Sequence, residues 1–250
     1  MSVAVIIVAA GSGTRLGADR PKALVQVAGR SILEHSLRTA LRTTGLAQVV
    51  VVAPAGHLAE VGELVERVQP SVAVTVVAGG ADRTASVAAG LAALTEAPGT
   101  AGDLGDDDLA GADPGEQVVL VHDAARCFTP VAVHDRVAAA VRDGWVAVVP
   151  ALPVVDTVKV VDERGVVTAT PDRASLRAVQ TPQGFLRTEL EAAHASGTSA
   201  TDDAALLEAL GHQVLVVEGD PAALKVTVPA DLERAARFAI PAGASEGEPR

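Results

Sequence analysis

The stretch VAAGSGTRLGADRPKALV, residues 8–25, does most to decide the fold of this chain. It continues an apolar run, SVAVIIVAA, and turns at Gly11 and Gly13. A turn of small residues at the end of a buried strand lets backbone N–H groups approach an anion, because glycine has no Cβ. Arg15 and Lys22 add two positive charges beside it. The stretch therefore predicts a first strand that ends in a phosphate-binding loop.

This loop matches neither of two familiar nucleotide loops. The dinucleotide fingerprint needs a third glycine where Leu16 stands, and Gly17 comes one residue late. The P-loop pattern fails because no Gly-Lys-Ser/Thr occurs in the chain. An ordinary glycine turn between a strand and a helix remains the alternative for Gly-Ser-Gly alone. Arg15 and Lys22 favour a site for a nucleoside triphosphate.

Composition and periodicity predict an α/β fold. The 250 residues are 49% hydrophobic, mostly Val and Ala, with only 2% aromatic residues. Strand-like runs are expected at 3–9, 48–53, 72–77, 117–121 and 145–150, with helical segments between them at 31–43, 57–68, 83–95 and 130–142. This alternation indicates a mostly parallel, Rossmann-like sheet, in which ligands bind at the carboxyl ends of the strands. The loops 10–22, 78–83 and 122–128 fall at such ends.

The pattern changes after residue 152. Residues 152–172 read as two strands joined by a turn at 162–165, which predicts a β-hairpin arm that projects from the sheet and packs on a second copy of the chain. Helices near 186–196 and 201–210, a strand at 213–217 and a last helix from Pro229 are expected to follow. We expect one domain over 1–240, with 241–250 a disordered tail.

The net charge of −11 is unevenly distributed. Residues 97–117 hold six acidic residues and no basic one, and a solvated, flexible insertion is expected there rather than a metal site at 106–108. We expect deletion of residues 99–115 to leave activity largely intact. Without this insertion and the tail, 23 acidic residues face 19 basic ones. The charge disfavours nonspecific nucleic-acid binding. No apolar run reaches the roughly 20 residues of a membrane span, and the single Cys127 suits a cytoplasmic protein.

Three further segments carry polar groups suited to the same site. Asp123 leaves an apolar strand and is a candidate ligand for a divalent metal or a sugar hydroxyl. Arg126 is a candidate for a phosphate or polyol, and an Asp–Arg pair that braces the loop is the alternative. Ser86 begins a helix after paired glycines. Lys225, in a strand-like run, points into a polar cleft or lies on the surface.

No nucleophile with an assignable base is visible. Cys127 follows an arginine in a loop, and His122 is expected to pack beneath that loop. Several cations, a phosphate-sized loop and no nucleophile favour direct phosphoryl-type transfer, which depends on positioning and charge neutralisation.

Six motifs occur in an order that resembles the 2-C-methyl-D-erythritol 4-phosphate cytidylyltransferase family. They are AAGSGTRLG…RPKA, GGADRTASV, VHDAAR, DRASL…QTPQGF, TDDAALLE and KVTVPADL, and the resemblance covers residues 3–240 with 97–117 as an insertion. It implies attack by the methylerythritol phosphate oxygen on the α-phosphorus of CTP, with Mg²⁺ as cofactor and pyrophosphate as the leaving group, in nonmevalonate isoprenoid biosynthesis. It also implies a homodimer.

The resemblance assigns roles to residues of this chain. Arg15, Lys22 and Lys225 match catalytic cations that neutralise the triphosphate. The nucleotide-binding matches are Ala9, Ala10, Gly11, Gly13, Gly80 and Ser86. The matches for the acceptor side are Asp123, also the metal candidate, with Arg126, Thr157, Arg173 and Thr201; of these, Thr157 and Arg173 match contacts made across a dimer.

Four positions depart from the family pattern: Cys127 for proline, Arg177 for tryptophan, Ala223 for asparagine and Ala81 for an acidic residue. They leave the charged set complete. Two other functions stay open, which are a cytidylyltransferase for ribitol 5-phosphate and a nucleotide-binding protein without turnover.

Overall fold

Strand β1 (Val3–Val8) is the centre of the sheet and is buried along nearly its whole length. It pairs in parallel with β4 (Leu46–Ala53) on one side and with β6 (Val118–Asp123) on the other. The computed structural model describes residues 1–11, 13–95, 117–198 and 200–239. The predicted tail 241–250 and all but the last residue of the predicted insertion 97–117 lie outside the described residues.

The main sheet has the order β5-β4-β1-β6-β11-β7, and β7 pairs with both β10 and β12. Its remaining strands are β5 (Ala73–Ala78), β7 (Ala147–Pro153), β10 (Arg177–Val179), β11 (Gln183–Leu186) and β12 (Val214–Glu218). Strands β10 and β11 run antiparallel to their neighbours, and the other pairs are parallel. The predicted α/β, mostly parallel sheet is confirmed, but the antiparallel insertion at 177–186 was not predicted.

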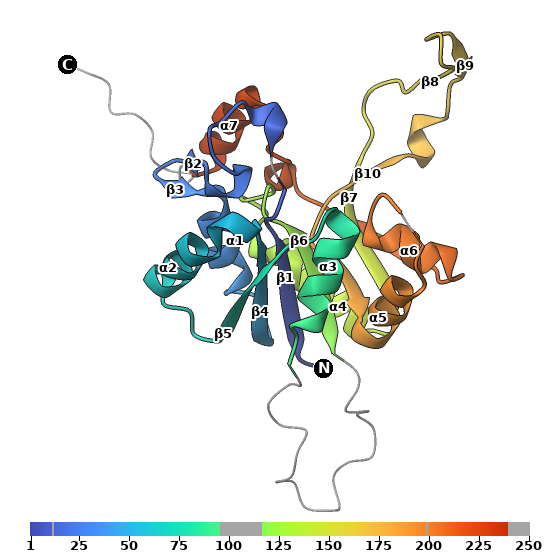
Figure 1. Cartoon of the computed structure of the whole chain (residues 1–250). Helices are drawn as coiled ribbons and strands as arrows, with labels where there is room; N and C mark the ends of the chain where they lie inside the picture. Colours follow the sequence, from blue (N-terminus) through green and yellow to red (C-terminus); the bar gives the residue numbers. More distant parts are fainter. Residues whose placement is uncertain (12, 96–116, 199, 240–250) are drawn as a thin grey trace, which may run out of the picture.

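Helices cover both faces of this sheet (Figure 1). Alternate residues of β1 point to opposite faces, so Val5 and Ile7 join one apolar core while Ala4 and Ile6 join another. The first core contains residues of α1 (Ile32–Ala40), α2 (Leu58–Val68), α4 (Val131–Arg142) and α7 (Pro229–Ala236). The second contains residues of α3 (Arg83–Ala92), α5 (Arg187–Ala195) and α6 (Asp203–Ala209). This arrangement explains why the strands read as continuous Val-rich runs.

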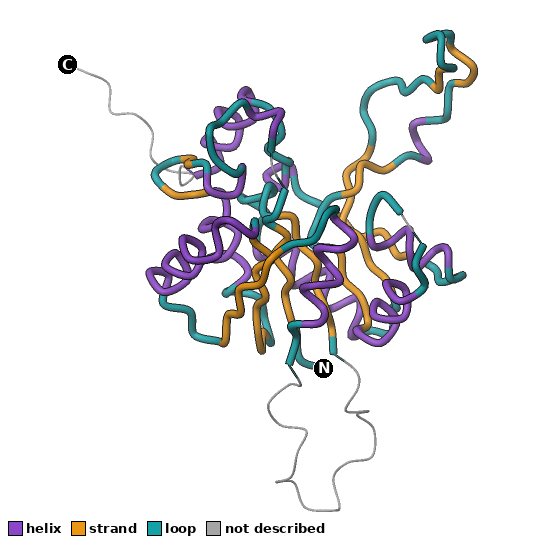
Figure 2. Tube along the Cα trace, viewed as in Figure 1, coloured by secondary structure: helices purple, strands orange, loops and turns teal. Residues whose placement is uncertain are grey.

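The segment between β7 and β10 projects away from the sheet as an arm (Figures 1 and 2). It carries the short antiparallel pair β8 (Val160–Val161) and β9 (Val167–Ala169), with Gly165 at a φ of +79° in the turn. Its valines are exposed, and Val155 is 77% accessible. The predicted projecting hairpin is present.

One predicted strand is absent from the described structure. Residues 224–227 form an extended segment that no strand pairs with, and it is held by a hydrogen bond from Val226 N–H to the carbonyl of Ala125, with an N–O distance of 2.9 Å.

Two shorter strands, β2 (Gln26–Val27) and β3 (Arg30–Ser31), form a separate hairpin before α1. Among the helices in the described part of the chain, none is long and apolar enough to cross a membrane.

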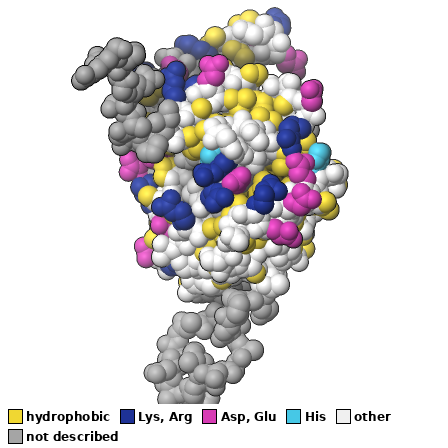
Figure 3. Space-filling model, turned by 90° about the vertical axis from the view of Figure 1, so that its left-hand side faces the viewer, with side chains coloured by type: hydrophobic (Ala, Val, Ile, Leu, Met, Phe, Trp, Pro, Cys, Tyr) yellow, Lys and Arg dark blue, Asp and Glu magenta, His cyan; other side chains and the backbone are white. Residues whose placement is uncertain are grey.

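The face of the molecule formed by α1 and α2 has a mixed charge (Figure 3). Lys and Arg side chains are interspersed there with Asp and Glu. On α1, Glu34 accepts from Arg38 Nε at 2.9 Å and lies 3.5 Å from Arg30 Nε. Such exposed pairs each contribute little to stability, about 0.2–1 kcal/mol.

Candidate active site

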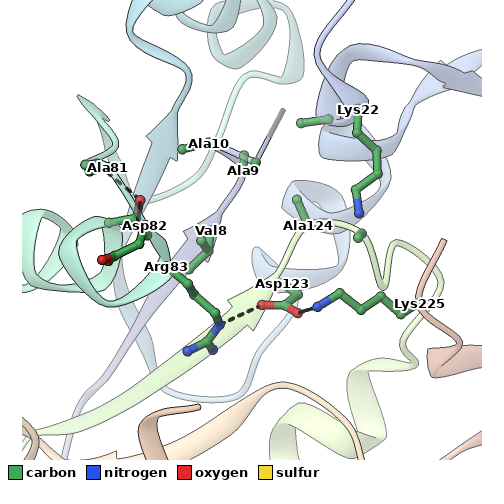
Figure 4. A pocket seen from close by; sticks show the side chains of 15 residues that line it. Val8, Ala9, Ala10, Lys22, Ala81, Asp82, Arg83, Asp123, Ala124 and Lys225 are labelled. Carbon is green, nitrogen blue, oxygen red and sulfur yellow. Dashed lines mark hydrogen bonds and ion pairs between the residues drawn. The ribbon is translucent and has the colours of Figure 1, made fainter. Parts of the chain in front are cut away.

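A cavity of about 440 Å³ lies where the strand order reverses, between β1 and β6. The chain proceeds from β1 to β4 and β5 on one side, then crosses back to place β6 on the other side of β1. In open α/β sheets this switch point is where ligands bind, outside the carboxyl ends of the strands. The lining residues come from the loops after β1, β5 and β6 and from the segment before α7: Val8, Ala9, Ala10, Gly11, Lys22, Ala23, Gly80, Ala81, Asp82, Arg83, Ser86, Asp123, Ala124, Ala125 and Lys225 (Figure 4).

The loop after β1 brings Lys22 back over the end of its own strand. Gly13 has a φ of +66°, and a Cβ there would lie 2.3 Å from the Cβ of Lys22, so only glycine permits this approach. Arg20, farther along the loop, forms an ion pair with Glu60 of α2. The predicted loop 10–22 therefore lies at the ligand edge with its lysine turned inward.

Lys22 is half-buried, and its Nζ donates a hydrogen bond to the carbonyl of Val226 at 3.0 Å. Burial lowers the pKa of Lys22, and the nearby charge of Lys225 lowers it further. Arg15 lies on the 3-10 turn Thr14–Leu16; it is exposed and is not among the lining residues. Its charge also lowers the pKa of Lys22. The cations that line the cavity are Lys22, Arg83 and Lys225.

Asp123 is the central carboxylate of the cavity. It ends β6 directly opposite Val8, and its backbone N–H donates to Thr181 Oγ1 at 3.0 Å. Its Oδ2 lies 2.6 Å from Lys225 Nζ, and its Oδ1 lies 3.4 Å from Arg83 Nε (Figure 4). Burial alone would raise the pKa of Asp123, but Lys225 and Arg83 lower it to about 2. The carboxylate is thus ionised at neutral pH.

The loop after β5 closes the opposite side of the cavity. A Cβ on Gly79 would lie 2.2 Å from the Cβ of Ala10, so glycine allows this loop to meet the loop after β1. Gly80 N–H donates to Ser86 Oγ at 3.2 Å, and Ser86 Oγ donates to the carbonyl of Asp82 at 2.7 Å. Ser86 is buried in the first turns of α3. These contacts fix the loop after β5 against the loop after β1 on this side of the cavity.

Arg126 is turned away from the cavity. Its Nη1 and Nη2 donate to the carbonyls of Ala223 and Val179 at 2.7 and 3.1 Å, and it is not among the lining residues. The expected alternative, an ion pair with Asp123, does not form in the described structure, because Asp123 pairs with Lys225 and Arg83 instead. Burial lowers the pKa of Arg126, while Asp123 raises it.

The three other predicted acceptor residues besides Asp123 and Arg126 also lie outside this cavity. Thr157 and Arg173 are exposed on the projecting arm, where Arg173 Nη1 donates to the carbonyl of Val155 at 2.7 Å. Thr201 is exposed immediately before α6, and its neighbour Asp202 caps that helix by accepting from Ala205 N–H at 3.0 Å. The structure therefore gathers eight of the predicted residues in the cavity: Ala9, Ala10, Gly11, Lys22, Gly80, Ser86, Asp123 and Lys225.

Sequence reasoning missed Arg83 as a residue of the site. It lines the cavity and contacts Asp123 on one side and the buried Asp203 on the other. The available signal was its place as the first residue of a helix at a strand-to-helix turn, directly after the capping Asp82. Asp203 gave no such signal, because it reads as an ordinary acid in the first turn of a helix.

Two other polar residues are unsuited to catalysis. Cys127 is buried, and burial raises the pKa of its thiol to about 12. His122 is buried beneath the loop, as expected, and burial lowers its pKa to about 4. His122 Nδ1 lies 3.1 Å from Thr181 Oγ1. Both groups stay neutral at pH 7.

The described residues contain no cluster of three or more His, Cys, Asp or Glu side chains that could enclose a metal by themselves. Mg²⁺ commonly binds through one or two carboxylates, with substrate phosphates and water as its other ligands. Asp123, ionised and facing the cavity, fits a site of that kind. For Asp123 to bind Mg²⁺, either Lys225 or Arg83 would have to release the carboxylate oxygen that it now contacts.

Comparison with known proteins agrees with this geometry. Residues 3–101 and 106–240 match the family model of 2-C-methyl-D-erythritol 4-phosphate cytidylyltransferase. The chain is 48% identical over 234 residues to a protein of that name from Nocardia farcinica (strain IFM 10152), covering 94% of this chain and 92% of the relative.

Solved structures agree as well. The chain is similar to 4-diphosphocytidyl-2C-methyl-D-erythritol synthase from Anaerococcus prevotii DSM 20548, with a TM-score of 0.77, 28% identity, and coverage of 95% of this chain and 96% of that one. It is also similar to the 2-C-methyl-D-erythritol 4-phosphate cytidylyltransferase from Thermus thermophilus, with a TM-score of 0.70, 34% identity, and coverage of 96% and 99%.

Proposed function

Because the chain belongs to the 2-C-methyl-D-erythritol 4-phosphate cytidylyltransferase family, we propose that it transfers CMP from CTP to 2-C-methyl-D-erythritol 4-phosphate, releasing pyrophosphate, and that the cavity between β1 and β6 is where it does so. The products are 4-diphosphocytidyl-2-C-methyl-D-erythritol and pyrophosphate. The observation that carries the proposal is the convergence of Lys22, Asp123 and Lys225 at the switch point of the sheet.

The cations of the site neutralise the triphosphate. In-line attack on the α-phosphorus builds negative charge on the phosphate oxygens, and fixed cations stabilise that charge most where water is excluded. Lys22 is held half-buried by the carbonyl of Val226, and Lys225 is held by Asp123. Arg15, exposed in the loop after β1, would meet the outer phosphates. None of these roles requires a covalent intermediate.

The two glycine loops select the base. Backbone groups of Ala9, Ala10 and Gly11 on one side and of Gly80 on the other line the cavity, and the buried Ser86 accepts from the Gly80 N–H. These backbone groups would distinguish the small pyrimidine ring from a purine. Gly13 belongs to the same loop and permits the close approach of Lys22.

Mg²⁺ is the cofactor we propose for this site. It would be held by Asp123 together with phosphate oxygens of CTP, and it would supply charge neutralisation to the triphosphate. Lys225 and Arg83 keep the Asp123 carboxylate ionised and oriented before the nucleotide binds.

The acceptor side is completed by a second copy of the chain. Thr157 and Arg173 lie on an arm that projects away from its own sheet, and the arm's exposed valines form an apolar surface. In a homodimer this arm would cover the partner's cavity and bring both residues to the acceptor phosphate. Thr201 and Arg126 are the candidates from the same subunit. A monomer at micromolar concentration in light scattering would contradict this arrangement.

An acceptor assay tests the function. Purified protein with CTP and Mg²⁺ receives either 2-C-methyl-D-erythritol 4-phosphate or ribitol 5-phosphate, and pyrophosphate release is measured for each. We expect turnover with the methylerythritol phosphate, and little with ATP in place of CTP. Preferential turnover of ribitol 5-phosphate would assign the chain to the alternative acceptor. CTP binding without turnover of either acceptor would indicate a nucleotide-binding protein.

A further inference from the structure

A series of side chains joined by ion pairs and hydrogen bonds extends from the cavity to the space between α3, α5 and α6. Lys225 Nζ lies 2.6 Å from Asp123 Oδ2, and Arg83 Nε lies 3.4 Å from Asp123 Oδ1. Arg83 Nη1 lies 2.6 Å from Asp203 Oδ2. His194 Nε2 lies 3.0 Å from Asp203 Oδ1. Arg83 is therefore shared by two carboxylates, one that lines the cavity and one behind it.

The two contacts of Arg83 are unequal. The bond to Asp203 is short and charge-assisted, whereas the contact to Asp123 is long. The Asp203 side chain is 1% exposed and the Arg83 side chain is 27% exposed. Asp203 thus holds the guanidinium from the inside, and Arg83 presents its Nε–H to the carboxylate in the cavity.

Asp203 is itself fixed on both sides. It is the first residue of α6, and both of its oxygens accept a hydrogen bond. His194, on α5, has a side chain that is 4% exposed, and its Nδ1 has no hydrogen-bond partner in the described structure. A histidine whose other nitrogen has no partner contributes through the one bond it makes, here to Asp203.

We propose that Asp203 and His194 are positioning residues of the proposed transferase site: they fix Arg83, and Arg83 with Lys225 fixes the Asp123 carboxylate in the orientation that the reaction uses. The proposal rests on the proposed function of the cavity. Partners of this outer kind typically change metal affinity or activity by about 10-fold to 100-fold when they are removed. Loss of Asp203 frees Arg83 to leave Asp123, so that the carboxylate is no longer held in one orientation.

A double-mutant cycle tests the proposal. Asp203→Asn, Arg83→Gln and the double variant are assayed for kcat and for KM of CTP and acceptor, with the unfolding midpoint recorded for each. We expect Asp203→Asn to lower kcat about 10-fold or more while KM for CTP changes little. If Asp203 acts through Arg83, the double variant is no slower than Arg83→Gln alone. Losses that multiply, or an Asp203→Asn kcat within about twofold of wild type, would overturn the proposal.

Glu189→Gln is the matched control. Glu189 also ties α5 to the end of α6, through His212 at 3.1 Å, but it is a surface residue remote from the cavity lining. This acid-to-amide change is expected to leave kcat unaltered. His194→Gln keeps a side-chain N–H for Asp203 and should retain more activity than His194→Phe, which keeps the bulk but not the donor. Equal losses in the two His194 variants would contradict the proposed role of the hydrogen bond.

A readout without turnover separates this inference from the proposed function. The Nε–H signal of Arg83, followed by nitrogen NMR in the full chain, should exchange with water faster in Asp203→Asn than in wild type or Glu189→Gln. Unchanged exchange would overturn the positioning role whether or not the wild type is active. A wild type inactive with both acceptors, but with this difference in exchange, would contradict only the proposed function.

Discussion

The cavity and the arm differ in how far their side chains find partners within a single chain. In the cavity, Lys22 is half-buried, Asp123 is buried and Lys225 is exposed, and each has a hydrogen-bond partner within the chain. In the arm, the valines are exposed and the short β8–β9 pair is the main regular structure. One region is organised before any ligand arrives, and the other presents an apolar surface that is unfavourable in water. This difference supports our proposal that one subunit supplies the chemistry and that two subunits complete the acceptor side.

The largest effect is expected in the cavity. Lys22→Ala removes a half-buried cation from the phosphate region and should lower kcat about 100-fold or more. The fold should persist, because Lys22 makes its side-chain hydrogen bond only to the carbonyl of Val226 in the described structure. Arg42→Ala, at an exposed cation just after α1, is the control and should leave kcat unchanged. Steady-state pyrophosphate release at normal rates in Lys22→Ala would refute the role of the cavity.

Mixing inactive variants tests whether the arm acts on a partner. Lys22→Ala damages the cavity, and Arg173→Ala damages the arm. If the arm completes the partner's site, mixed dimers contain one undamaged site, and equal mixing after unfolding and refolding restores about a quarter of wild-type activity. If the arm served its own subunit, every site would remain damaged and no activity would return. Pyrophosphate release before and after mixing distinguishes the two.

A smaller effect is expected from acid. His134, on α4, packs against His122 with ring centroids 5.0 Å apart, and burial lowers its pKa well below the ordinary value. A depressed histidine pKa means that the unfolded chain binds the proton more readily, so stability present above about pH 6.5 is lost as the pH falls. Between about pH 7 and about pH 4.5 we expect the free energy of unfolding to fall by at least about 1 kcal/mol.

Denaturant titrations measure this pH dependence. His134→Gln should reduce it, leaving the part that His122 contributes through its own lowered pKa, whereas His57→Gln, at a half-exposed surface residue, should leave it as in wild type. The arm sequence 154–176 contains no histidine, so the loss of stability from histidine protonation arises in the sheet and its helices. An unchanged slope in His134→Gln would contradict the assignment.

The smallest effect is expected at Cys127, which is buried in the loop after β6. Because burial raises the pKa of the thiol to about 12, it stays protonated at about pH 8. We expect an aromatic disulfide reagent to modify the native protein far more slowly than the denatured one, with little change in activity. Rapid modification of the folded protein would show that the loop after β6 opens.

Much of the sheet could be predicted from local pattern. Val-rich runs separated by helical periods placed β1, β4, β5, β6 and β7 close to their observed positions, and the turn at Gly165 located the arm. The antiparallel strand β11 escaped prediction because Gln183 and Gly184 have low strand propensity. They form a strand because β11 lies between β6 and β7 and pairs with the backbone of both, which would otherwise have unpaired N–H and C=O groups there.

The sequence by itself determined the class of fold and the glycine loop with its two cations Arg15 and Lys22, since each depends on residues close together along the chain. Tertiary structure decided which of them meet. It turned Lys22 and Lys225 into the cavity, directed Arg126 to backbone carbonyls and placed Arg83 between Asp123 and Asp203. Such choices depend on strand order and on which buried charges find partners, and neither property is encoded by local spacing. The loop at residues 8–25 predicted a phosphate site, and the strand order located it.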